Sequence, residues 1–351
     1  LMHFHLSLTA FEIKPMNILK LKTPYLIFLG SEENKLNAKT GAGLVEWRPE
    51  LCKAQFNLTE SGLDLGLPRM SIAQAKEAGI KSLIIGTASI GGGLQDEWMD
   101  ALVEAAQAGI DIVAGLHNPL NGNAALKAAS EKTSSSLIDV RTPPENLPVG
   151  TGIKRTGKRI LMAGTDCVSG KKFTALSMER DMKKRGLNAD FRASGQTGIM
   201  IAGSGIPIDA VVSDFIAGAA EQLSPDNADD HWDVIEGQGS IFHPGYAAVS
   251  MGLLIGSQPD AFVVCHHASR SHMDGWESYI LPTIEQVIER TTDIGSLTNP
   301  NIKCVGISVN TSGMSEQQRE DYCADVSKKL GLPCIDPHVH GTDKIIDTLV
   351  A

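Results

Sequence analysis

The sequence has no uninterrupted apolar run that approaches the ~20 residues of a membrane-spanning helix. It has no excess of positive charge either, since its net charge is −10 at pH 7, and this argues against nucleic acid or an anionic membrane as a partner. Cysteine never forms a C-x-x-C pair, which predicts reduced thiols in a cytoplasmic protein and no zinc-site spacing. The six cysteines are Cys52, Cys167, Cys265, Cys304, Cys323 and Cys334. Anionic ligands must therefore be held by local lysines, arginines and backbone amides.

The length of 351 residues is enough for two domains, and a hydrophobic content of 42 % fits sizeable cores. Residues 137–157 carry several prolines and glycines and little apolar periodicity, so we expect the domain boundary there. We predict a first domain over residues 16–150 and a second over residues 151–351. Residues 1–15 lack the positive start and the cleavage site of a secretory signal, and we interpret them as an extension without a functional role.

Strands alternate with helices along the first domain. Strands are predicted over residues 25–29, 82–85 and 111–114, and helices over residues 72–78 and 96–108. This order indicates an α/β fold with an open, Rossmann-like parallel sheet. Functional loops in such sheets lie beyond the carboxyl ends of the strands, where Gly86–Gly93 and His117 fall. His117 is a candidate substrate contact, with a hydrogen-bonded structural role as the alternative.

The second domain opens on a glycine-bounded turn between a predicted strand, residues 158–163, and a predicted helix, residues 172–184. The backbone N–H groups of such a turn converge on an anion, and Lys171 can reach phosphoryl oxygens. The candidate phosphate-binding residues are Gly164, Thr165, Asp166, Cys167, Val168, Ser169, Gly170, Lys171, Lys172, Phe173 and Thr174. The alternative is an ordinary glycine-rich turn, because Gly-Lys dipeptides are common.

This turn departs from the usual phosphate-loop pattern in two ways. Five residues separate Gly164 from Gly170 where the pattern has four, and Lys172 stands where a Ser or Thr binds Mg²⁺. The missing hydroxyl weakens any expectation of ATP hydrolysis, and we do not expect Mg²⁺ to be essential.

Polar residues follow two later strands, predicted over residues 231–235 and 260–264. Glu236 is placed to accept a proton or bind a cation, with a solvated strand-end acid as the alternative. His266, His267 and Arg270 form the densest polar group. It lacks the further ligand that zinc needs, so we predict no metal site and favour an anionic substrate gripped by Arg270.

Two resemblances concern these motifs. The spacing Gly164-Thr-Asp…Gly170-Lys171 and the segment Glu236-Gly-Gln-Gly239 are similar to those of dethiobiotin synthetase, a P-loop protein that has threonine at the position of Lys172. A longer resemblance runs from Met16 onward and adds Lys39-Thr-Gly41…Trp47-Arg48-Pro49, Gly91-Gly-Gly-Leu94…Trp98 and Ala108-Gly-Ile-Asp-Ile-Val-Ala-Gly-Leu-His117. Together these motifs resemble a two-domain family, long described as a domain of unknown function, that contains bacterial D-glutamate N-acetyltransferases.

That resemblance implies acetyl transfer from acetyl-CoA to D-glutamate in D-amino-acid catabolism. CoA phosphates are then expected on Gly164–Thr174, and Arg48 and Arg270 are candidate clamps for the carboxylates of the acceptor, unless they form structural ion pairs. Glu236, His266 and His267 are the candidate bases. No serine or cysteine shows a nucleophile signature, so direct attack by the amine is preferred over an acyl-enzyme.

Two other functions stay open on the sequence. One is an ATP- and Mg²⁺-dependent ligase or kinase of the dethiobiotin synthetase type, and the other is a non-catalytic sensor of nucleotides or CoA. The partners expected in every case are small molecules. We predict a helix over residues 209–220, whose small residues tolerate close packing, and we expect a homo-oligomer.

Overall fold

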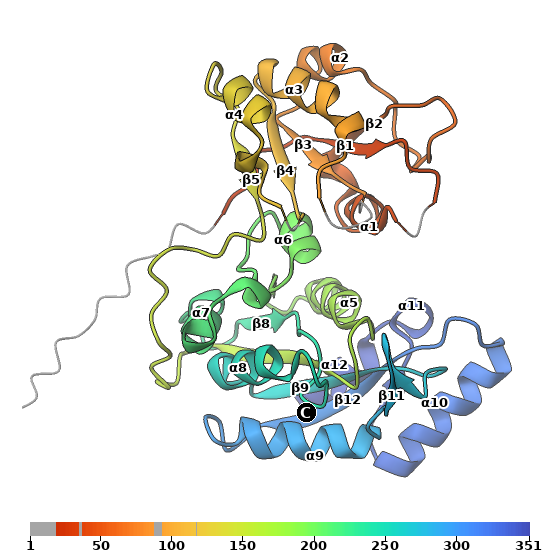
Figure 1. The fold of residues 1–351 in the computed structure, drawn as a ribbon. Helices are drawn as coiled ribbons and strands as arrows, with labels where there is room; N and C mark the ends of the chain where they lie inside the picture. The colour runs from red at the N-terminus through yellow and green to blue at the C-terminus, as the bar shows by residue number, and fades with distance from the viewer. Residues whose placement is uncertain (1–18, 35–36, 88–92, 117) are drawn as a thin grey trace, which may run out of the picture.

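The computed structural model describes residues 19–34, 37–87, 93–116 and 118–351 and consists of two α/β units, each built on a parallel sheet (Figure 1). The predicted fold class is therefore confirmed. The predicted extension over residues 1–15, most of the Gly86–Gly93 loop and His117 lie outside the described residues.

The first sheet has the strand order β2-β1-β3-β4-β5, with every neighbouring pair parallel. Its strands are β1 (Tyr25–Gly30), β2 (Cys52–Asn57), β3 (Ser82–Ile85), β4 (Asp111–Ala114) and β5 (Leu137–Asp139). The helices of this half are α1 (Lys39–Trp47), α2 (Ile72–Glu77), α3 (Met99–Gln107) and α4 (Ala124–Ser130), with short 3₁₀ turns at Pro49–Leu51, Asp96–Trp98 and Leu120–Gly122.

The second sheet has the order β13-β12-β9-β6-β8-β7, again parallel throughout. Its strands are β6 (Lys158–Gly164), β7 (Ala189–Arg192), β8 (Trp232–Ile235), β9 (Ala261–His267), β12 (Lys303–Asn310) and β13 (Cys334–Ile335). A small antiparallel hairpin, β10 (His272–Met273) and β11 (Trp276–Ile280), follows β9.

The helices of the second half start and stop where side chains and glycines satisfy the helix ends. Ser315 caps α10 in a reciprocal capping box with Gln318, and Gly331 ends it in a left-handed conformation. The helices are α5 (Lys171–Lys184), α6 (Gln196–Ala202), α7 (Ile216–Leu223), α8 (Ala247–Ser257), α9 (Ile284–Gly295), α10 (Glu316–Leu330), α11 (Pro337–His340) and α12 (Asp343–Val350), with 3₁₀ turns at Ile208–Ala210 and Ser213–Phe215.

One hydrophobic core joins the two halves of the chain. Ile27, Ile84 and Val113 of the first sheet share a buried cluster with Ile199 and Ile201 of α6. Helix α6 comes from the second half of the sequence but lies beside α1 against the first sheet (Figure 1). The carboxyl ends of the strands of both sheets therefore lie near one junction. The apolar pattern of either half of the sequence does not predict this junction.

Two local predictions were wrong, and one helix was not predicted. The predicted linker begins too early, because Leu137–Asp139 pairs with β4 as β5. The helix predicted over residues 209–220 is two 3₁₀ turns followed by α7, since the β-branched pair Val211-Val212 disfavours a continuous helix. Helix α1 was not expected, because its glycines obscure the helical pattern and its formation depends on packing.

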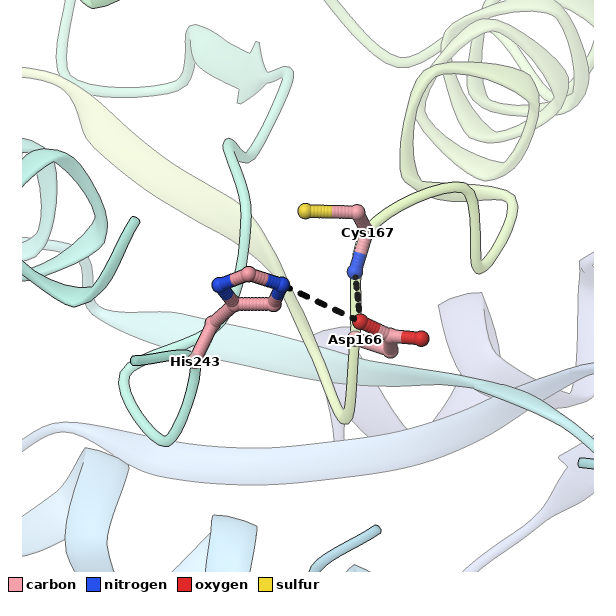
Figure 2. A group of neighbouring side chains, drawn as sticks. All are labelled: Asp166, Cys167 and His243. Carbon is pink, nitrogen blue, oxygen red and sulfur yellow. Dashed lines mark hydrogen bonds and ion pairs between the residues drawn. The ribbon is translucent and has the colours of Figure 1, made fainter. Parts of the chain in front are cut away.

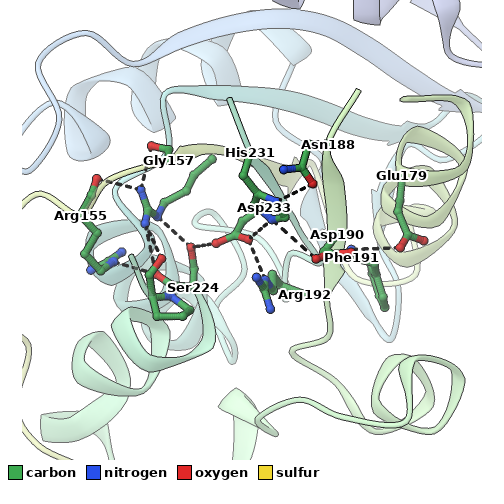
Figure 3. A network of polar contacts seen from close by, with 12 residues as sticks. Arg155, Gly157, Glu179, Asn188, Asp190, Phe191, Arg192, Ser224, His231 and Asp233 are labelled. Carbon is green, nitrogen blue, oxygen red and sulfur yellow. Dashed lines mark hydrogen bonds and ion pairs between the residues drawn. The ribbon is translucent and has the colours of Figure 1, made fainter. Parts of the chain in front are cut away.

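A buried polar network joins β6, β7 and β8 (Figure 3). Asp233 accepts hydrogen bonds from Ser224 Oγ (2.5 Å) and Arg192 Nε (2.7 Å). Arg159, which is 1 % exposed, donates from Nε to Ser224 Oγ at 2.8 Å. Arg159 and Asp233 are each the second residue of their strand, at the end opposite the glycine-bounded turn, so their contacts stabilise the fold away from that turn.

No helix among the described residues is both long and apolar enough to cross a membrane. All six cysteines are free thiols, as the sequence predicted.

Candidate active site

The predicted phosphate loop joins β6 to α5. Gly170 has a φ of 95°, a left-handed conformation that glycine adopts without strain, and it directly precedes the first turn of α5. Gly164 allows Lys171 to fold back over the loop, because a Cβ at Gly164 would lie 2.8 Å from Ser169 Oγ and 3.1 Å from Lys171 Nζ. The sequence thus places its glycines where the chain curls most tightly.

Lys171 is buried inside this loop. Its Nζ donates to the backbone carbonyl of Asp166 at 2.6 Å and to Ser169 Oγ at 3.2 Å. Burial lowers the pKa of Lys171, and the thiols and carboxylates around it act in the opposite direction. The Lys171 ammonium has only neutral oxygen partners and lies at the N-terminus of α5. It is therefore available to neutralise the charge of a bound phosphate.

Asp166 fixes the shape of the loop. Its Oδ1 accepts from the N–H of Cys167 at 2.7 Å, and its Oδ2 accepts from Arg270 Nη1 at 3.1 Å and from the N–H of Asp274 at 2.9 Å. Arg270 also donates to the carbonyl of Cys167 at 2.9 Å. The structure therefore brings Arg270, one of the two predicted clamps, against the phosphate loop.

His243 completes the loop and was missed at the level of sequence. Figure 2 shows its ring facing Asp166 and Cys167, with Nε2 3.9 Å from Asp166 Oδ1. The ring is fully buried, and Nε2 has no hydrogen-bond partner among the described atoms. Its one sequence signal is the segment His243-Pro-Gly245 after Glu236–Gly239, which has no spacing typical of a site.

The tautomer of His243 decides what this cluster can hold. The ligand atoms of Asp166, Cys167 and His243 all lie within 4.8 Å of one another, a grouping compatible with a metal ion. However, the N–H of Gly245 donates to His243 Nδ1 at 3.1 Å, so the proton of the neutral ring is on Nε2. Burial lowers the pKa of His243 and favours this neutral form. The ring therefore offers an N–H donor to the loop, which suits an anion better than a metal.

Glu236 follows β8 and lies beside the amino end of α6. Its Oε2 accepts from the N–H of Ser194 at 3.0 Å and from the N–H of Gly195 at 3.1 Å. Burial raises the pKa of Glu236 to about 7, although the charge of Lys172 and these two N–H groups pull the pKa down. A carboxylate with a pKa near neutrality is suited to act as a general base, and Glu236 stays one of the candidate bases.

Gly198 makes room for this carboxylate. A Cβ at Gly198 would lie 2.2 Å from Glu236 Oε2. We expect Gly198→Ala to displace Glu236 and to lower the free energy of unfolding by about 1–3 kcal/mol, measured by chemical denaturation. Gly122→Ala is the matched control, because no atom lies within 4 Å of its added Cβ. Equal stabilities for the two variants would show that Gly198 has no such role.

The first domain reaches this site through α1. Trp47 packs edge-on against Phe173 of α5, with 5.0 Å between the ring centroids. Thr40 Oγ1 lies 3.2 Å from Thr197 Oγ1 of α6. Arg48 Nη2 lies 3.3 Å from Glu179 Oε2, so the second predicted clamp forms an ion pair between the two halves. Arg48 thus holds α1 against α5 in this structure.

The two candidate bases after β9 differ in position. His266 Nδ1 lies 3.0 Å from Thr165 Oγ1 of the phosphate loop, whereas His267 Nδ1 lies 3.2 Å from Ser269 Oγ in its own segment. Burial, together with the charge of His267, lowers the pKa of His266 to about 4. An imidazole with so low a pKa is a weak base at neutral pH, and Glu236 is the stronger candidate.

Comparison with family models covers most of the chain. A model described as a P-loop domain of unknown function, DUF1611_C, matches residues 148–346. A second model, described as a Rossmann-like domain of unknown function, DUF1611_N, matches residues 50–143.

Full-length relatives agree with these matches. A protein of Tritonibacter scottomollicae named D-glutamate N-acetyltransferase is 46 % identical over 331 residues, which is 94 % of this chain and 99 % of the relative. A protein of the same name from a Pseudoalteromonas species is 45 % identical over 94 % of this chain and 100 % of its own length. The crystal structure of a DUF1611 family protein from Anabaena variabilis has a TM-score of 0.83 and 33 % identity, and it covers 94 % of this chain and 99 % of its own.

Proposed function

The chain belongs to the DUF1611 family, and from that premise we propose that it transfers the acetyl group of acetyl-CoA to the amino group of D-glutamate. The observation that carries this proposal is the shared name of two relatives that match nearly the whole chain at 45–46 % identity. The family models also agree with the predicted Rossmann-like and P-loop halves. We place the reaction in D-amino-acid catabolism in the cytoplasm, where thiols such as these six are kept reduced.

The phosphate loop suits CoA because binding CoA requires hydrogen-bond donors to its phosphates and does not require a hydroxyl that binds Mg²⁺. Lys171, Arg270 and the N–H of His243 surround the loop and would neutralise or hydrogen-bond the phosphates. Thr174, the next hydroxyl after Lys172, is already engaged, because its Oγ1 lies 2.7 Å from Ser308 Oγ and donates to Gly170 O. These contacts support a carrier of phosphates over an ATP-hydrolysing site.

Glu236 is the proposed base. One ammonium proton of D-glutamate passes to Glu236, and the freed amine attacks the carbonyl carbon of the thioester. The tetrahedral intermediate then collapses and the C–S bond breaks. The nitrogen loses its second proton in this step, and the departing thiolate of CoA takes up that proton. Burial raises the pKa of Cys167 and keeps its thiol protonated, which supports direct attack over transfer through that residue.

The test is incubation with acetyl-CoA and a panel of D- and L-amino acids while free thiol is measured. We expect thiol release that depends on D-glutamate. Consumption of Mg²⁺-ATP without thiol would replace the proposal with a ligase or kinase. Tight binding of CoA with no product for any acceptor would replace it with a sensor.

Arg48 separates a structural role from a role in binding. Because its guanidinium is paired with Glu179, we expect Arg48→Met to lower the free energy of unfolding by about 1 kcal/mol and to leave the KM for D-glutamate unchanged. Glu179 keeps a second partner, Lys183 Nζ at 2.8 Å, which limits the loss of stability. A rise in KM of tenfold or more, with unchanged stability, would restore Arg48 as a carboxylate clamp.

A further inference from the structure

Lys172 occupies the position at which phosphate loops usually carry a metal-binding hydroxyl. Its side chain is half-buried at the start of α5. Among the described residues, no carboxylate oxygen lies within 4.0 Å of its Nζ and no hydrogen bond satisfies it. Lys171, its neighbour, donates two hydrogen bonds inside the loop, so the two lysines have different surroundings.

The charges that act most strongly on Lys172 come from both halves of the chain. Glu236 exerts the largest favourable charge effect on it, followed by Glu46 of α1, while Lys39 of α1 opposes them. Burial outweighs these effects and lowers the pKa of Lys172. A half-buried ammonium without a direct partner is costly, and an anion bound beside it would compensate that cost.

Contacts between helices fix the walls of the junction between the two halves. Helix α1 is fastened to α5 by the Trp47–Phe173 contact and to α6 by the Thr40–Thr197 contact. The N–H groups of Ser194 and Gly195 donate hydrogen bonds to Glu236 Oε2, and no hydrogen bond to Oε1 occurs among the described residues. Glu236 follows β8, and Lys172 lies in the first turn of the helix that follows the loop after the neighbouring strand β6. A negative group and a positive group therefore lie at the carboxyl ends of adjacent strands, beside the phosphate loop.

We propose that Lys172 binds a carboxylate of the acceptor amino acid and not the phosphates of the donor, so that the junction between α1, α5 and Glu236 is the acceptor site. This proposal rests on the proposed function. An acidic amino acid presents an ammonium and a carboxylate a few bonds apart, which matches Glu236 and Lys172 in sign. Lysine replaces the metal-binding hydroxyl because the ligand at this position is an anion that needs no metal.

The test compares steady-state kinetics of Lys172→Met with those of the wild type and of Lys184→Met. Lys184 is the matched control, because it lies on the same helix and is 68 % exposed beside Asp181. We expect Lys172→Met to raise the KM for D-glutamate about 10- to 100-fold and to change the KM for acetyl-CoA less than about twofold. Lys172→Arg keeps the charge and is expected to restore most of the affinity.

D-Glutamine identifies the carboxylate. If Lys172 binds the side-chain carboxylate, Lys172→Met loses affinity for D-glutamate but not for D-glutamine. If Lys172 binds the α-carboxylate, Lys172→Met loses affinity for both amino acids. Either result supports the proposal. A raised KM for acetyl-CoA with an unchanged KM for D-glutamate would overturn it, as would no change in either. If Lys172→Met does not fold, the same comparison is made with Lys172→Gln. Failure of the proposed function is distinct, because the wild type itself would then release no thiol.

Discussion

Lys171→Met is expected to weaken the binding of CoA about 100-fold or more. The ammonium of Lys171 lies inside the phosphate loop, 2.6 Å from the carbonyl of Asp166, and a bound phosphate would replace these neutral partners with charged ones. Each hydrogen bond to a charged group contributes about 1.5–3 kcal/mol, and one ammonium makes more than one of them. Binding is measured by calorimetry and by the rise in the thermal midpoint that CoA produces, which falls as affinity falls.

The control for Lys171→Met is again Lys184→Met, which removes the same charge from the outer face of α5. Its affinity for CoA is expected to equal that of the wild type. Loss of affinity in both variants would indicate a general electrostatic effect of the helix. Full affinity in Lys171→Met would place the donor phosphates elsewhere in the molecule and remove the main support for the role of the loop.

The phosphate loop could be predicted from the sequence because all of its determinants are close together in the chain. A strand, two glycines, a lysine and a helix occur in order, and the structure has β6 over Lys158–Gly164 and α5 over Lys171–Lys184. Glu236 was predicted for a similar reason, because a carboxylate directly after a buried strand must lie at the carboxyl edge of the sheet.

The partners of these residues could not be predicted, because distant segments supply them. His243 reaches Asp166 from a segment without a recognisable motif, and Arg270 braces the loop instead of standing free as a clamp. Arg48 carried two alternatives at the level of sequence, and the ion pair with Glu179 became visible only when α1 and α5 were placed side by side. The burial of Glu236, which determines its basicity, depends on α6 and on the space that Gly198 leaves.

Glu236→Gln is expected to lower kcat by about 10²- to 10⁴-fold, the usual contribution of a general base. Because the pKa of Glu236 is raised to about 7, the wild-type rate should increase with pH as this carboxylate ionises near neutrality. The variant has no group to ionise there, so its residual rate should lack that step. The measurement is a pH profile of kcat/KM for both proteins between pH 5 and 9. An unchanged step in the variant would transfer the role of base to another residue.

The same substitution should make the protein more stable, which separates loss of the base from damage to the fold. Because folding raises the pKa of Glu236, its favourable contribution to stability is fully present below the unfolded value, 4.5, and is lost as the pH rises through about 7. At pH 8 the buried charge costs about 3 kcal/mol relative to the unfolded chain. Glutamine carries no charge, and its amide oxygen can still accept from the N–H groups of Ser194 and Gly195. Denaturation should therefore show a gain of about 2–3 kcal/mol at pH 8 and little gain at pH 5. If Glu236→Gln is both less active and less stable at pH 8, then Glu236 stabilises the fold, and its buried charge does not lower the stability of the wild type.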